Sequence, residues 1–175
     1  PSGVTASDIV GAVNTSTGKE TGLETIRQVF PRLGKIPGTL LAPGWSHNAV
    51  VAAALQAKTE AINGVFNCVC LIDIPSGSSG ATVCTGVKTA KESLGVTSPH
   101  AAALWPMAQV GKKKYYMSAI FGAMMAYNDV LNGDVPCNPS NKALPIDATV
   151  LADGTEVLLD QQQADDYINA VGVIT

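Results

Sequence analysis

Residues 39–63 carry the pattern that most restricts how this chain folds. Thr39 to Ala42 is a short apolar run without polar alternation, which is typical of a strand covered on both faces. Pro43 and Gly44 then make a tight turn, and from Ser46 onward the apolar side chains recur at helical spacing. The stretch is therefore predicted to be a strand, a turn and a helix in immediate succession.

The predicted helix begins with a residue type that caps helices, because the Ser46 hydroxyl can accept an amide hydrogen bond from the first turn. Its apolar stripe includes Val50, Val51, Ala54, Leu55 and Ile62. Asn63 and Gly64 are expected to end the helix. A second apolar strand follows at residues 66–74, so the whole is predicted to be a βαβ unit with parallel strands.

The rest of the chain continues this alternation. Further predicted elements are a strand at 9–13, helices at 23–33, 81–94 and 116–131, a strand at 101–104, a hairpin at 149–159 turning at Asp153-Gly154, and a short helix at 162–171. The predicted fold class is α/β: a mostly parallel sheet flanked by helices, with a C-terminal β-hairpin and short helix. The strands near Leu40, Val69 and Leu104 are expected to be neighbours.

Two segments bear on how the chain is divided and packed. Residues 116–131 form the most apolar predicted helix, which is expected to be buried nearly all round. Residues 112–115 before it are predicted to be a polar turn. We expect residues 1–147 to form the α/β domain, and residues 148–175 to hold the hairpin, the short helix and the start of a following region.

The composition limits the classes of partner. Hydrophobic residues make up 46% of the 175 residues and charged residues only 14%, so core material is ample and the surface favours burial against other proteins. A net charge of -3 gives no electrostatic reason to expect nucleic acid or an anionic membrane as a ligand. The apolar runs are of strand length, so no membrane insertion is predicted. Lys112 to Lys114 is the one basic run, and the exposed entrance of a helix explains Tyr115-Tyr116 beside it without a nucleic-acid ligand.

The cysteines and histidines do not form a metal-binding pattern. Cys68, Cys70, Cys84 and Cys137 lack the two-residue spacing of paired zinc ligands, and buried free thiols are expected. Cys68 and Cys70 are two apart in a predicted strand and should point to the same face. No metal or cofactor site is predicted from these residues.

An enzyme of the α/β-hydrolase class is the first alternative. Gly44-Trp45-Ser46-His47-Asn48 lies between a strand and a helix, where such enzymes place a nucleophilic serine, but Asn48 stands where the motif requires glycine. His47 adjoins Ser46 and points elsewhere on a helix, which leaves His100 as the other candidate base. Capping of the helix explains Ser46 with fewer assumptions.

A nucleotide-binding domain is the second alternative. The loop from Ser76 to Gly80 lies between a strand and a helix, where backbone amides can hold a phosphate. The P-loop spacing and its lysine are absent, so a simple connection is favoured. Asp73 ends the preceding strand as a candidate metal ligand, but it has no second carboxylate close in sequence.

Four blocks of sequence carry a family resemblance. They occur in the order LLAPGWSHNAVVAAALQAKTE, LIDIPSG, HAAALWP and NPSNKALPI, and they extend over most of the chain. Together they resemble the central region of the tail sheath protein of contractile phages, prophages and phage-tail-like particles. The resemblance implies a structural subunit without catalytic, cofactor-binding or metal-binding residues, which is not an enzyme.

The resemblance also implies partners and a location. Sheath subunits assemble with other copies of themselves around an inner tail tube protein, between baseplate and tail terminator proteins, and their contraction drives the tube through a cell envelope. The expected location is the virion tail, with assembly in the cytoplasm of the bacterial host. The chain has no initiator methionine and stops in the β-branched run at 173–175, so a fragment is expected that stays soluble and does not polymerise without its flanking regions.

Overall fold

The centre of the molecule is a four-stranded parallel sheet in a computed structural model that describes residues 3–60, 62, 64–140 and 142–175. Its strand order is β1-β2-β3-β7, with bounds Thr39–Leu41, Val69–Asp73, Ala101–Leu104 and Val173–Ile174. In register, Leu40 lies beside Cys70, and Leu71 beside Ala102. The prediction of a mostly parallel sheet, with the strands near Leu40, Val69 and Leu104 adjacent, is confirmed.

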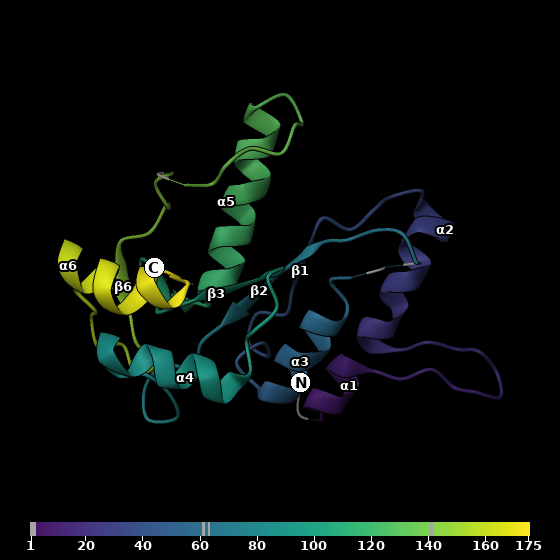
Figure 1. The fold of residues 1–175 in the computed structure, drawn as a ribbon, viewed down its shortest axis with the longest axis horizontal. Helices are drawn as coiled ribbons and strands as arrows, with labels where there is room; N and C mark the ends of the chain where they lie inside the picture. Colours follow the sequence, from purple (N-terminus) through teal and green to yellow (C-terminus); the bar gives the residue numbers. More distant parts are fainter. Residues whose placement is uncertain (1–2, 61, 63, 141) are drawn as a thin grey trace.

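Most of the helices cover one face of this sheet (Figure 1). Alternate residues of β2, Cys70 and Ile72, face a core that includes Val51 and Leu55 of α3 (Ala49–Ala57) and Val87 of α4 (Val87–Leu94). The same core takes in residues of α1 (Ala6–Val10), η1 (Gly22–Gln28) and the C-terminal helical turns. This face of the sheet thus buries the larger share of the apolar side chains.

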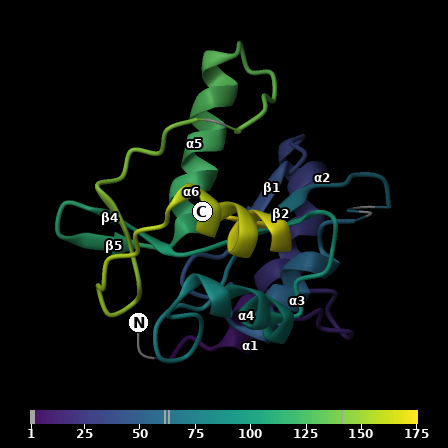
Figure 2. The ribbon, with the colours of Figure 1, turned by 60° about the vertical axis from the view of Figure 1, so that its left-hand side comes forward.

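The opposite face of the sheet is covered by one long helix, α5 (Met117–Leu131). Leu71 and Leu104 pack there against Met117, Phe121 and Met124. The predicted bounds of this helix are confirmed, but the prediction that it is buried nearly all round is wrong. Its buried residues all lie in the first eight positions, and the second half extends beyond the sheet (Figure 2).

A second, antiparallel sheet has the order β5-β4-β6 and was not predicted as such. Its strands are β4 (Met107–Val110), β5 (Lys113–Tyr115) and β6 (Ala148–Val150). The predicted polar turn at 112–115 is wrong, because most of it is strand β5. The predicted C-terminal hairpin is reduced to one bridge, between Val150 and Glu156, and the other edge of β6 pairs with β4.

The N-terminal segment corrects another prediction. Of the strand expected at residues 9–13, Ile9 and Val10 instead end α1, whose first turn is held by a capping box between Thr5 and Asp8, and Val13 forms only an isolated antiparallel bridge with Glu20. A run of five apolar residues suits a strand and a short helix equally well, and the cap settles the choice. The predicted helix at 23–33 is confirmed as η1 followed by α2 (Val29–Leu33), which ends at Gly34.

The remaining bounds differ from the prediction mainly by shortening. Helix α3 ends at Ala57, while its expected stop at Asn63 lies outside the described residues. Strand β2 is shorter than predicted, and the helix expected at 81–94 divides into η2 (Cys84–Gly86) and α4. The short C-terminal helix is confirmed as a continuous helical segment of three types: α6 (Gln161–Gln163), η3 (Ala164–Ile168) and η4 (Asn169–Val171).

Candidate functional site

The carboxyl end of β2 holds a buried acidic side chain, Asp73, with 3% of its surface exposed. Its Oδ1 accepts the backbone N–H of Ser118 at 2.8 Å, and its Oδ2 accepts the Ser118 hydroxyl at 2.6 Å. Oδ2 also accepts the Ser46 hydroxyl at 2.8 Å, and the Asp73 backbone N–H donates to Ser46 Oγ at 3.0 Å. We call these three residues the Asp73 clamp, because they join β2, the turn after β1 and the start of α5.

The protein groups around the Asp73 carboxylate suit a negative charge without any ligand. Ser118 lies in the first turn of α5, where free amides and the helix dipole favour a negative charge. The N-cap residue of α5, Tyr116, makes no capping hydrogen bond with its own side chain, so Asp73 caps the helix from another element. The carboxylate is thus fully occupied by protein donors, which is the arrangement expected of a structural anion.

The prediction that Ser46 caps the following helix is wrong. Asn48 is the N-cap of α3, and its side chain accepts the Val50 amide at 3.0 Å. Ser46 is fully buried two residues earlier and turns toward Asp73. Both residue types cap helices well, and the buried carboxylate draws Ser46 away from that role.

The hydrolase alternative needs a histidine that accepts the Ser46 hydroxyl, but this hydroxyl donates to Asp73. The His47 ring stacks on Tyr116 with centroids 5.4 Å apart, and its buried Nδ1 makes no hydrogen bond to the described residues. His100 precedes β3, where its carbonyl accepts the Cys70 amide. Cys70 and Asp73 are three residues apart on a strand, so His100 and Ser46 lie about 10 Å apart along the sheet.

The loop from Ser76 to Gly80 is closed by its own backbone. The amides of Ala81 and Gly80 donate to the carbonyls of Pro75 and Gly77, at 2.9 and 3.0 Å. A side chain at position 80 would meet the Pro75 carbonyl oxygen at 1.9 Å, which explains the glycine. The α-helix starts only at Val87, after the turn of η2, so the loop does not place a helix N-terminus over a phosphate.

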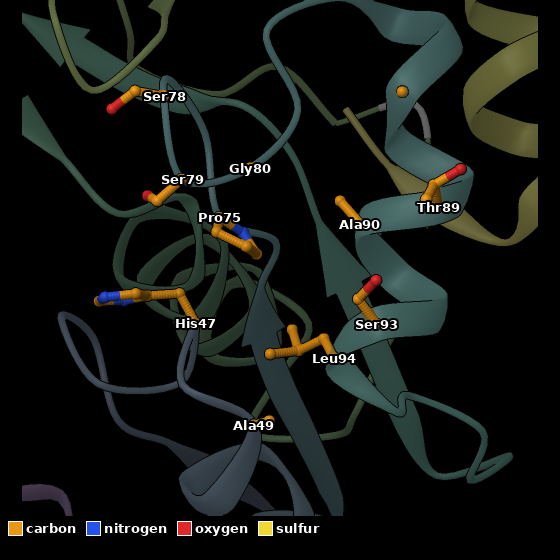
Figure 3. Close-up of a pocket in the computed structure, with 11 residues that line it drawn as sticks. His47, Ala49, Pro75, Ser78, Ser79, Gly80, Thr89, Ala90, Ser93 and Leu94 are labelled. Atoms are coloured by element: carbon orange, nitrogen blue, oxygen red, sulfur yellow. The ribbon is translucent and has the colours of Figure 1, made fainter.

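An open pocket of about 660 Å³ lies beside this loop. Figure 3 shows Thr89, Ala90 and Ser93 of α4 on one side and His47 and Ser79 across from them. His47 is the one titratable side chain among the described lining residues, and the rest of the lining is small or apolar. A smaller hollow of about 90 Å³ reaches Asp73 and Tyr116 from the same region. Apart from His47, the described residues that line the larger pocket offer no ionisable side chain to fix a substrate.

The structure also shows where the four cysteines and the basic run from Lys112 to Lys114 lie. Cys68 and Cys70 are buried free thiols, as predicted, whereas Cys84 and Cys137 are half-buried. Burial raises the pKa of Cys70 to about 12. Lys113 and Lys114 belong to the exposed strand β5, but Tyr116 lies against His47 rather than beside Tyr115 as a second stacking platform.

The described residues contain neither a metal-binding cluster nor a membrane-spanning helix. Three or more histidine, cysteine or acidic side chains do not gather anywhere in that part of the chain in a way that would hold a metal ion. Across the same residues, every helix is too short or too polar to cross a membrane.

Sequence reasoning missed Ser118 and the second sheet. Two features of the sequence could have indicated that Ser118 bonds to Asp73. Ser118 carries a hydroxyl in the first turn of an otherwise apolar helix, and Asp73 ends a buried strand. The second sheet is hidden because β4 follows β3 after only Trp105 and Pro106, which are joined by a cis peptide bond.

The comparison with curated proteins gives a distant relative. A Pseudomonas aeruginosa (strain UCBPP-PA14) protein described as "Putative prophage major tail sheath protein" is 27% identical to this chain over 139 residues. The match covers 79% of this chain but 34% of the relative, so it reaches only about a third of that protein's length. No family model matches the chain, and no solved structure matches it either. The similarity supports a tail sheath-like relationship and a structural role.

Proposed function

We propose that this chain is the central α/β region of a contractile tail sheath subunit. The observation that carries the proposal is the similarity to the prophage tail sheath protein over 79% of the chain. The occupied Asp73 clamp agrees with it, because the most polar buried cluster at the carboxyl end of the sheet holds elements together instead of facing a substrate.

In the proposed role, copies of the subunit stack around an inner tail tube, between baseplate and tail terminator proteins, in a virion tail or a related particle. Assembly takes place in the host cytoplasm, and contraction drives the tube through a cell envelope during genome ejection. The energy resides in subunit packing and not in nucleotide, which fits a Ser76–Gly80 loop whose Gly77 and Gly80 amides bond within the turn. Residues 1–147 would form the α/β domain, and residues 148–175 would lead to the region that follows.

The test is electron microscopy of the complete subunit with the flanking regions restored, with and without tube protein. Rings, tubes or sheath-like polymers are the expected result, because extended flanking segments can add strands to neighbouring sheets. A complete subunit that stays monomeric at high concentration beside its tube protein, and that hydrolyses an ester or a nucleotide, would overturn the proposal.

A further inference from the structure

The second half of α5 carries apolar side chains that are largely exposed. Tyr127, Val130 and Leu131 are 64%, 63% and 67% exposed, and Val135 just beyond the helix is 57% exposed. We call these four residues the α5 tip. The helix projects away from the sheet and its other helices in both views (Figures 1 and 2), so the tip is free to meet another molecule.

The electrostatic character of the α5 tip is negative. Residues 115–142 contain two acidic side chains, Asp129 and Asp134, and one basic side chain, Lys142, which lines a hollow with Tyr127, so their net charge is negative. The last turn of α5 carries no basic residue, so the negative end of the helix dipole is not offset by a side chain of the helix. A surface that binds the tip should therefore be apolar and positive.

The same molecule carries such a surface around α2. Leu33 and Val65 are 68% and 73% exposed, and Ile36 and Phe30 are exposed beside them. The rings of Phe30 and Phe66 lie 5.0 Å apart, which places Val65 next to α2. We call Phe30, Leu33, Ile36 and Val65 the α2 patch. Arg32 and Lys35 flank it, and residues 25–59 contain no aspartate or glutamate.

We propose that the α5 tip of one copy docks on the α2 patch of the next copy. The two surfaces are complementary in charge, and both are exposed in the single chain, so the contact joins different copies. Because tip and patch are different surfaces, the contact is heterologous and repeats from copy to copy, giving a ring or an open helix. This inference rests on the proposed function and names one interface within it.

The contact is small, so it is weak in the isolated chain and becomes strong only when it acts together with others. The first experiment is therefore sedimentation velocity of the 175-residue chain at increasing concentration. In contrast to the expectation from the sequence that the chain does not polymerise without its flanking regions, we expect the average sedimentation coefficient to rise with concentration and to continue past the dimer. A chain that remains monomeric at every concentration, or that stops at a symmetric dimer, overturns the inference.

Two double variants identify the surfaces. Val130→Gln with Leu131→Gln removes the tip, and Leu33→Gln with Ile36→Gln removes the patch. Each variant alone should lose self-association, because every contact needs one tip and one patch. An equimolar mixture should recover dimers and no larger species, because one intact tip meets one intact patch. A mixture that stays monomeric, while both variants keep the wild-type circular dichroism spectrum and unfolding midpoint, also overturns the inference.

A charge exchange tests the electrostatic part. Asp134→Lys should weaken self-association, as should Arg32→Glu with Lys35→Glu. All three changes in one chain should restore it toward the wild-type level, because the signs are again opposite. If the triple variant is as weak as either parent, charge complementarity does not select the partner and the inference is wrong.

The complete subunit separates this inference from the proposed function. If it forms sheath-like tubes that the tip and patch variants leave unchanged, the inference fails while the proposed function stands. Another part of the subunit or a different tail protein would then cover the tip. If the 175-residue chain associates through tip and patch but the complete subunit never forms tubes, the proposed function fails and the contact remains.

Discussion

The two halves of α5 have similar apolar compositions but opposite surroundings. The first half, Met117 to Met124, holds all four buried residues of the helix and lies on the sheet. The second half, Met125 to Leu131, exposes Tyr127, Val130 and Leu131. A helix of 15 residues is about 22 Å long, and only part of that length has β1 and β2 beneath it. Distance from the sheet, rather than hydrophobicity, decides which half is buried.

The buried half is also fixed at its start, whereas the exposed half has only local hydrogen bonds. Ser118 binds Asp73 through both its amide and its hydroxyl. In the exposed half, Asp129 accepts the Cys137 amide at 2.9 Å, which ties the helix to the loop just after it. The comparison teaches that one helix can anchor a fold with its first turns and offer a surface with its last.

The largest expected effect is the loss of the clamp. Asp73→Ala should lower the free energy of unfolding by about 3–4 kcal/mol, because Ser46 and Ser118 become buried donors without an acceptor. Urea denaturation of the wild type and of Asp73→Ala measures this difference in the free energy of unfolding. Asp129→Ala, which removes a carboxylate from the exposed half, is the matched control and should cost no more than about 1 kcal/mol. Equal losses in the two variants would show that the start of α5 is no better anchored than its end.

The sequence predicted the parts of this comparison that depend on local periodicity. The bounds of α5 and the neighbouring strands at Leu40, Val69 and Leu104 follow from apolar runs and turn residues. The Asp73 clamp could not be predicted in this way, because Ser46 and Ser118 lie 27 and 45 residues from Asp73 in the chain. Only the folded sheet brings them together.

Two local misassignments have the same origin. Ser46 and Asn48 are both competent caps, and the choice between them depends on the distant carboxylate of Asp73. The exposure of Tyr127 depends on where the sheet ends, which an apolar helix sequence does not record. The geometry of the candidate site therefore depends on contacts between residues far apart in the chain. The order of helices and strands depends on local patterns and could be predicted from the sequence.

The next largest effect concerns the contact between α5 and the sheet. A Cβ at Gly122 would lie 3.3 Å from Leu71 Cδ1 and 3.4 Å from Leu41 Cδ2, so a larger side chain must displace the helix. Gly122→Leu should cost about 2 kcal/mol, although leucine favours helices more than glycine does. Ala123→Leu, one position on and exposed, should change stability by less than about 0.5 kcal/mol.

Thermal unfolding of both variants measures that difference. If Gly122→Leu is as stable as Ala123→Leu, the helix does not approach β1 and β2 as closely as described, and the two halves of α5 differ less than the burial indicates. Because the starting residues differ, helix propensity alone favours Gly122→Leu over Ala123→Leu, so a greater loss at position 122 reports packing against the sheet.

The smallest expected effect is the pH dependence contributed by Tyr116 at the start of α5. Burial, and then the nearby charge of Asp73, raises the pKa of Tyr116 above its ordinary value of 10.0. Above about pH 10 the unfolded chain has lost this proton while the folded chain keeps it, so unfolding releases a proton and stability falls as pH rises toward the folded pKa. Below pH 10 this contribution to stability is fully present. Tyr116→Phe should make the fall shallower, by at most about 1.4 kcal/mol per pH unit.

The measurement is urea denaturation of wild type and Tyr116→Phe between pH 9 and about 11, measured beside Tyr127→Phe, which removes a phenol from the exposed half. The phenylalanine ring retains the surface that stacks on His47, so the comparison isolates the hydroxyl. A Tyr116→Phe slope equal to that of wild type would mean that the phenol does not sense Asp73 or its burial. Because the charge of Asp73 is the second cause of the shift, after burial, adding Tyr116→Phe to an Asp73→Asn background should change the slope somewhat less than it does in the wild-type background.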